Sequence, residues 1–311
     1  PKRAFRIRGV KVRIPAANSN STGAQYTQSA TTVSIVSNNH GLAVGDSIIF
    51  DATSGNGVDG TYKITSVPNA YSFTFTSGTS QTVTTSTCTF KITPHVDLQT
   101  GRINYPNGYI FNGTMGAAQW CSCPAMVLLD LLTTERYGFG THITDSNLDL
   151  FSFVAASKYA NELVSDGQGG QEARFSCNVN IQSSKEAFDL IKDLATVMRC
   201  IAIWSAGSIT ITQDRPTDSS YLFSLANVTS EGFNYTGSSL KQRHSVVSVS
   251  YFNMDSREID FEIVEDTSLQ SKIGIVKKDV KAFACTSRGQ AQRLGKAIIF
   301  SENQESEVVN F

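Results

Sequence analysis

The sequence lacks any long apolar run. Among its 311 residues no stretch of about 18 consecutive apolar residues occurs, and the longest apolar segment, Ala125 to Leu132, is interrupted by Asp130. The sequence also lacks an excess of charge of either sign, because 26 basic and 27 acidic residues give a formal net charge of -1. We therefore predict no membrane-spanning helix and no general nucleic-acid binder, since the latter carries a basic excess.

Residues suited to metal or nucleophilic chemistry are few and scattered. The four histidines lie far apart in the sequence and no H-E-x-x-H motif occurs, so a metal hydrolase would lack its ligands. Cys121 and Cys123 form a C-x-C pair, but no second pair or nearby histidine completes four ligands. We interpret all six cysteines as free, buried thiols, with a metal site at Cys121 and Cys123 as the alternative. We expect no catalytic residues, no cofactor site and no metal site.

What is present suits a folded protein. The composition is 40% hydrophobic and 17% charged, which predicts a globular chain of about two domains with a substantial core. The chain begins at Pro1 without an apolar leader, and it ends inside a strand-like segment, 307–311. We therefore expect it to be an excerpt of a longer protein.

Residues 18–93 differ in composition from the rest of the chain. Serine, threonine, asparagine and glycine dominate there, and only five residues are charged: Asp46, Asp51, Asp59, Lys63 and Lys91. Turn residues separate β-branched and aromatic runs, so we predict a small β-barrel or β-sandwich module of five strands. The predicted strands are 32–36, 47–50, 61–67, 71–75 and 82–92.

The remaining residues, 1–17 and 94–311, predict an α+β fold with mixed β-sheets and packed helices. Near the start, basic and apolar residues alternate from Lys2 to Ile14, which predicts a strand whose basic face is solvated or meets nucleic acid or an acidic partner. Further along, Pro124 suits the first position of a helix that stops at Gly138. The other predicted elements are a helix capped by Ser146 or Asn147, a strand at 175–181, a helix starting at the capping box 183–186, hairpins 200–204 with 208–213 and 246–252 with 258–264, and a helix at 286–301.

Two weaker functional interpretations remain open. Paired carboxylates hydrolyse glycans, and the one acidic cluster supplies Asp260, Glu265 and Asp266 as candidates, although a solvated strand end explains the same residues. Alternatively, the β-module binds surface sugar through aromatic residues, namely Tyr62, Tyr71, Phe73 and Phe75. Strand alternation places most of these aromatics in the core instead.

Several motifs occur together along the chain. The first is the segment Cys123 to Gly140, which combines a helix with an R-Y-G-x-G turn. The others are 166–170, 198–200 with Trp204, 213–216, Lys241 with 243–244, 264–266 and 285–291. In order and spacing these motifs resemble one protein family, the lambda-type tip attachment protein or central tail hub (tail tip protein J family) of phages. The resemblance covers 8–15 and about 96 to the end, and residues 18–93 look inserted where the family has a short connection.

The resemblance implies a structural virion protein rather than an enzyme. It implies tail hub domains and a homotrimer that closes the tail tube, transmits the receptor-binding signal and lets DNA pass during ejection into the host. The implied partners are other tail tip, baseplate and tail tube proteins, the tape measure protein, and a host receptor bound through regions outside this excerpt. It implies location in the virion tail tip, after assembly in the host cytoplasm. The alternative is a tail-tip protein that binds or degrades glycan or cell wall.

Overall fold

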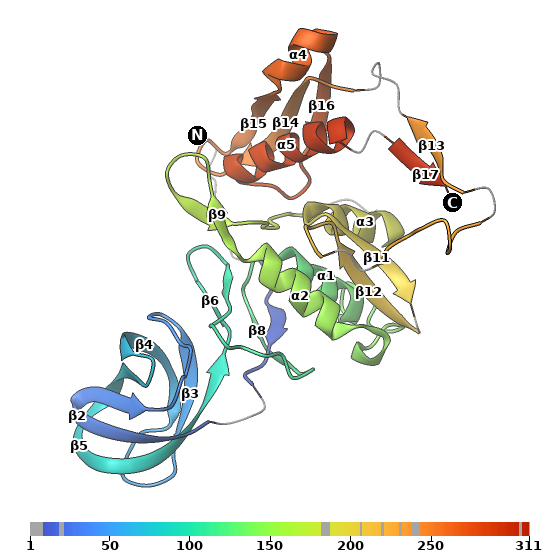
Figure 1. Ribbon diagram of the computed structural model, residues 1–311. Helices are drawn as coiled ribbons and strands as arrows, with labels where there is room; N and C mark the ends of the chain where they lie inside the picture. The colour runs from blue at the N-terminus through green and yellow to red at the C-terminus, as the bar shows by residue number, and fades with distance from the viewer. Residues whose placement is uncertain are drawn as a thin grey trace. The chain divides into compact units, whose positions relative to one another are not determined.

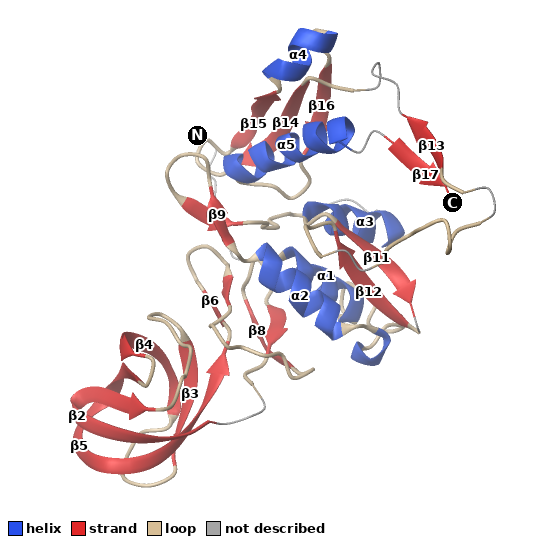
Figure 2. Ribbon diagram, in the orientation of Figure 1, coloured by secondary structure: helices blue, strands red, loops and turns tan. Residues whose placement is uncertain are grey.

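The computed structural model has an α+β fold (Figures 1 and 2). It describes residues 9–18, 22–181, 187–205, 207–218, 221–229, 232–237, 243–304 and 307–310. The chain divides into two compact units, the first formed by Pro1–Asn161 with Ile203–Ile211 and the second by Glu162–Ala202 with Thr212–Phe311. No helix in the described part is long and apolar enough to cross a membrane.

A curved antiparallel sheet makes up the β-rich part of the first unit (Figure 2). Its strand order is β2-β5-β3-β4, and β4 also pairs with β5. The strands are β2 (Thr22–Val36), β3 (Ser47–Ala52), β4 (Gly60–Asn69) and β5 (Ser72–Thr93). The prediction of five strands is corrected to four, because segments 71–75 and 82–92 belong to one continuous strand that pairs with β2 almost throughout.

The core of this sheet follows the alternation of its strands. Phe73 and Phe75 are fully buried, as is Phe50 on β3. The rings of Phe50 and Phe75 meet edge to face, with centroids 5.3 Å apart, and Tyr62 stacks on Phe75 at 4.3 Å. Such aromatic pairs add to the free energy gained by burying their area.

A helical layer completes the first unit. Helix α1 (Pro124–Thr133) packs against α2 (Leu150–Ala160), and a short 3-10 helix, η1 (Asp145–Asn147), lies between them in sequence. They are accompanied by two short strand pairs, β1 (Val12–Pro15) with β8 (Met115–Gln119) and β6 (His95–Val96) with β7 (Ile103–Asn104), and by an isolated bridge between Leu148 and Ile209. Residues outside the sheet, Tyr109, Phe111 and Val154, join its hydrophobic cluster. We still predict that residues 18–93 are an inserted module and that 1–17 and 94–311 form the hub region.

The caps of these helices differ in part from expectation. Pro124 does occupy the first turn of α1, but α1 ends at Thr133 rather than Gly138. The N-cap of α2 is Asp149, whose carboxylate accepts hydrogen bonds from two backbone N–H groups, and not Ser146 or Asn147. Asn147 instead accepts the N–H of Thr144 at the start of η1. The sequence offered three cap-type residues within four positions, so spacing alone did not separate them.

The second unit contains a three-stranded sheet covered by one helix. The order is β15-β14-β16, with β14 (Val246–Asn253) antiparallel to β15 (Glu258–Glu265) and parallel to β16 (Lys277–Lys281). Helix α5 (Arg288–Gln304) lies across this sheet (Figure 1) and buries Val247, Val249 and Val264 with its own Ala291 and Ile299. The hairpin prediction 246–252 with 258–264 is confirmed.

Smaller elements complete the second unit. They are β9 (Leu163–Ser165) with β10 (Gln171–Ala173), β13 (Asn234–Gly237) with β17 (Glu307–Asn310), and helices α3 (Ala187–Val197) and α4 (Thr267–Ile273). The predicted hairpin is present as β11 (Cys200–Ser205) with β12 (Ser208–Gln213), and its residues are divided between the two units.

One predicted strand is wrong, and two predictions lie outside the described residues. Segment 175–181 is not part of a strand, and among the described residues its backbone bonds to a side chain and a loop: Ser176 N–H donates to Gln290 Oε1, and Asn178 N–H donates to the carbonyl of Ala284. The capping box 183–186 and the strand's basic residues up to Arg8 are outside the described ranges, whereas Val12–Pro15 is a strand as expected. All six cysteines are buried free thiols, as predicted.

Candidate functional site

The turn that follows helix α1, residues 134–140, is stabilised by backbone hydrogen bonds to the end of the helix. The chain folds back on the end of the helix at once, since Phe139 N–H donates to the carbonyl of Leu131 and Gly140 N–H donates to that of Thr134, both at 3.0 Å. Both bonds use carbonyl groups that a helix C-terminus leaves without intrahelical partners. The turn therefore continues the hydrogen bonding of α1 rather than leaving it as a loose loop.

Two glycines make this return possible. A Cβ atom on Gly138 would overlap the carbonyl oxygen of Leu131, and one on Gly140 would overlap that of Thr133. Glycine is required here by the close backbone approach and not by a left-handed conformation, because neither glycine has a positive φ.

An ion pair ties strand β1 to η1 and to the last residue of α1. The guanidinium of Arg13 donates two hydrogen bonds to the carboxylate of Asp145, at 2.6 and 2.7 Å, and a third to Thr133 Oγ1 at 3.0 Å. The hydrogen bond from Arg13 lowers the pKa of Asp145 below its ordinary value. These residues line an open groove of about 620 Å³ together with residues of the turn.

Loss of this ion pair is expected to change the pH dependence of stability. Asp145 has a lowered pKa in the folded chain, so its contribution is present above the ordinary value of 3.8 and is lost as the pH falls through the folded value. The variant Asp145→Asn should therefore unfold at lower urea concentration than wild type at pH 7, with a smaller difference in acid. Exposed Asp51→Asn is the matched control, and an equal deficit of Asp145→Asn at both pH values would contradict the assignment.

The side chain of Tyr137 also connects the turn to helix α1. Its hydroxyl donates to the carboxylate of Asp130 on α1 at 2.5 Å. Partial burial, together with this carboxylate, raises the pKa of Tyr137 to about 12. The phenol therefore stays protonated at neutral pH and serves as a hydrogen-bond donor that fixes the turn to the helix.

The acidic candidates of the second unit do not form an acid–base pair. Side chains alternate along β15, so Asp260 lies on the face that α5 covers and Glu265 on the opposite face. Asp266 is the N-cap of α4 and accepts from the N–H groups of Ser268 and Leu269. Hydrogen bonds to the carboxylates lower the pKa of both aspartates, whereas a glycosidase acid needs a raised pKa.

A buried carboxylate nearby has a structural partner. Glu262 is 6% exposed and accepts from Nε of Arg288 at 2.7 Å, at the start of α5. Gln292 reaches the same carboxylate at 3.4 Å. Glu262 therefore holds α5 against the sheet.

The opposite face of this sheet carries exposed apolar side chains, which we call the open face. Ile259, Phe261 and Ile263 of β15 are 65%, 62% and 58% exposed, and Phe252 of β14 pairs with Ile259 and is 43% exposed. Grouped exposed apolar side chains of this kind mark interaction surfaces in soluble proteins. The sequence showed the alternation, but it did not reveal which of the two faces α5 covers.

Three of the four aromatic candidates in the β-module pack in or against its core, as strand alternation predicted for most of them. Phe73 and Phe75 are core residues, and Tyr62 donates its hydroxyl proton to the carbonyl of Val58 while stacking on Phe75. Tyr71 alone among the four is well exposed, at 58%. The four residues therefore do not form one binding surface.

Cys123 and His95 lie in surroundings that shift the pKa of each side chain. In the described part of the chain no three His, Cys, Asp or Glu residues are grouped as metal ligands. Cys123 is buried with its sulfur 3.1 Å from Ser157 Oγ, and burial raises its pKa. Burial likewise lowers the pKa of His95 to about 4, so its ring is neutral.

Comparison with known proteins shows where this architecture belongs. Residues 186–311 match a family model described as "Putative phage tail protein". The chain is 34% identical over 219 residues to Tip attachment protein J of Escherichia phage SECphi27, and 31% identical over 211 residues to the protein of the same name from Escherichia phage SECphi4. Each alignment covers 67% of this chain and 18% of the relative.

Two solved structures show weaker likenesses. The 43 kDa tail protein of prophage MuSo2 from Shewanella oneidensis aligns with 97% of this chain and 80% of its own, at 10% identity and a TM-score of 0.31. Phage phi92 endosialidase aligns with 35% of this chain and 16% of its own, at 23% identity and a TM-score of 0.20.

The sequence matches define the protein as a structural component of a phage tail. More particularly, the chain belongs to the tip attachment protein J family, as the motifs around the α1 turn predicted. It spans about a fifth of the length of the curated relatives it matches, 18% in each case.

Proposed function

We propose that this chain is part of the central hub of the tail tip, where three copies close the tail tube. In this role the hub transmits the receptor-binding signal and opens to let DNA pass into the host. The observation that carries the proposal is the 34% identity over 219 residues to a tip attachment protein. The implied partners are other tail tip and tail tube proteins, the tape measure protein, and a host receptor bound by other regions.

The open face supports an assembly role. Left uncovered, the side chains of Ile259, Phe261 and Ile263 are in contact with water. Covering them with a second copy of the chain would remove apolar area from solvent, which is favourable. The sheet that carries them lies within residues 186–311, the part matched by the phage tail family model. We propose that a neighbouring copy of the chain covers this face in the homotrimer.

Reversing the character of the open face tests this role. The variant Phe261→Lys places a charge where the interface needs an apolar ring, so its trimer should dissociate to monomers in light scattering, while far-UV circular dichroism shows that the chain is still folded. Ile110→Lys is the matched control, because Ile110 is 75% exposed in the first unit and its change should leave the trimer intact. A trimer that persists in Phe261→Lys, or a wild-type chain that is monomeric at every concentration, would contradict the proposed interface.

A further inference from the structure

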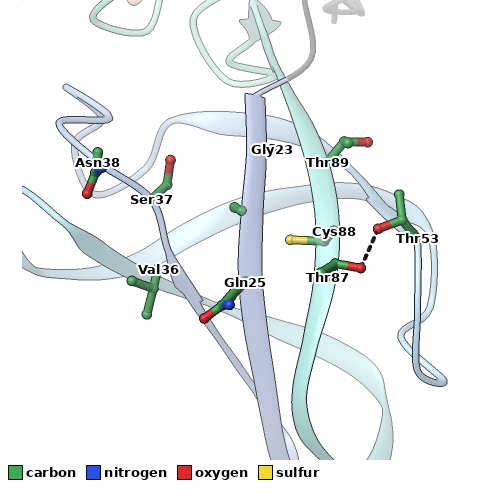
Figure 3. A pocket seen from close by; sticks show the side chains of 10 residues that line it. Gly23, Gln25, Val36, Ser37, Asn38, Thr53, Thr87, Cys88 and Thr89 are labelled. Atoms are coloured by element: carbon green, nitrogen blue, oxygen red, sulfur yellow. Dashed lines mark hydrogen bonds between the residues drawn. The ribbon is translucent and has the colours of Figure 1, made fainter.

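The β-rich part of the first unit contains a groove that the hub role does not use. Its volume is about 530 Å³. As Figure 3 shows, it lies along strand β2, where both ends of that strand and the last part of β5 meet. The lining residues are Gly23, Ala24, Gln25, Val36, Ser37, Asn38, Thr53, Thr87, Cys88 and Thr89. Ligand pockets of this size, roughly 300–1,000 Å³, are common among small-molecule sites.

The path of β2 creates the groove. Among the described strands β2 pairs with β5 alone, and its register shifts twice, between Tyr26 and Gln28 and between Ala30 and Thr32. Irregularities of this kind bend a strand and increase its twist. The bend brings residues 23–25 and 36–38, more than ten positions apart, to the two sides of one groove.

The groove is polar but carries no charge. None of its lining residues is Lys, Arg, Asp, Glu or His. Gln25 and Asn38 are exposed and supply amide donors and acceptors, and Thr89 supplies a hydroxyl. A phosphate, nucleotide or acidic sugar would find no opposite charge here, so the chemistry favours a neutral ligand rich in hydroxyl or amide groups.

Small apolar surfaces accompany these polar groups. Val36 is 57% exposed at one side of the groove and Ala24 is partly exposed beside it, whereas Cys88 is 2% exposed and has its side chain in the core. Close by, Ser37 N–H donates to the carbonyl of Tyr71, whose side chain is 58% exposed. Sugars present hydroxyl groups along their rims and C–H groups on their ring faces, and this groove offers partners for both.

We propose that this groove binds a neutral oligosaccharide. The inference is independent of the hub role, because it uses neither the open face nor the α1 turn. The residues differ from the aromatic set that the sequence suggested, since Phe73 and Phe75 are buried in the core.

Gly23 offers a direct way to block the groove. A Cβ atom placed on Gly23 would meet nothing within 4 Å, and its φ is not positive, so Gly23→Trp should fill the groove without disturbing the fold. Gly78→Trp is the matched control, because Gly78 is also an exposed strand glycine with nothing near its Cβ and does not line the groove. A third variant, Gln25→Ala with Asn38→Ala, removes the amides and adds no bulk.

The test is a titration of the 311-residue chain that is monitored by NMR. The neutral probes are maltotriose, lactose and chitotriose, and the acidic probe is 3′-sialyllactose. We expect at least one neutral probe to bind wild type and Gly78→Trp, with affinity at least tenfold lower in Gly23→Trp and in the double alanine variant. Absence of binding by every neutral probe, preference for the sialylated probe, or undiminished binding by Gly23→Trp would overturn the proposal. Light scattering of the same samples keeps the hub question separate, because a failed sugar titration leaves trimer formation unaffected.

Discussion

Substituting Gly138 by alanine is expected to destabilise the first unit more than any other single change at the α1 turn. The new Cβ atom would overlap the carbonyl oxygen of Leu131, which is fixed because it accepts the N–H of Phe139. The backbone has to move, and the bonds that continue α1 are lost with it. We expect a loss of about 3 kcal/mol or more, which lowers the unfolding temperature by about 6 °C or more.

A matched glycine provides the control for this experiment. Gly78→Ala adds the same methyl group at a position with nothing within 4 Å, so its unfolding temperature should stay within about 2 °C of wild type. Circular dichroism melts of the three chains give the comparison. Equal melting of Gly138→Ala and Gly78→Ala would show that the close approach at the turn does not exist in solution.

The second large effect is expected at Phe75, which tests the core of the β-rich part. Phe75 is fully buried and its ring contacts both Phe50 and Tyr62. Truncation to alanine removes the transfer free energy of the ring and leaves a cavity. Phe→Ala changes at such sites lower the free energy of unfolding by about 3–5 kcal/mol. Urea unfolding of wild type and Phe75→Ala is the measurement that checks this.

Tyr71 serves as the control for Phe75, because it is an aromatic residue of the same hairpin that is 58% exposed. Tyr71→Ala should change the free energy of unfolding by about 0.5 kcal/mol or less. If Phe75→Ala were as stable as Tyr71→Ala, Phe75 would be a surface residue, and the sequence interpretation of it as a sugar-binding aromatic would regain support.

Local signals in the sequence were sufficient for several elements. Pro124 followed by an apolar run predicted α1, and two alternating segments around 253–255 predicted the β14–β15 hairpin. These elements depend on neighbours in sequence, which a local pattern records. The motif ending at Gly140 also led to the correct family, since several spaced motifs together are more specific than any one of them.

Other features depend on contacts between distant residues and were not predictable. Segment 175–181 alternates like a strand, but its bonding partners are Ala284 and Gln290, more than one hundred positions away. Two predicted strands are one because β2 pairs with β5 along most of its length, despite two register shifts. The exposure of Phe261 likewise depends on the side of the sheet on which α5 packs.

The candidate sites likewise combine local features that the sequence showed with distant contacts that it did not show. The sequence placed glycines in the α1 turn but gave no sign of the carbonyl groups that they approach. It offered no signal for the neutral groove, because its two sides come from opposite ends of β2. The acidic cluster near Glu265 was visible in the sequence, yet alternation along β15 places Asp260 and Glu265 on opposite faces.

Electron cryomicroscopy of the tail tip of intact virions tests the central claim most directly. We predict three copies of this chain around the tube axis at the end of the tail, with the open face of β14–β15 of each copy covered by a neighbour. Virions whose tail tip lacks the chain, or holds a single copy away from the axis, would contradict the account.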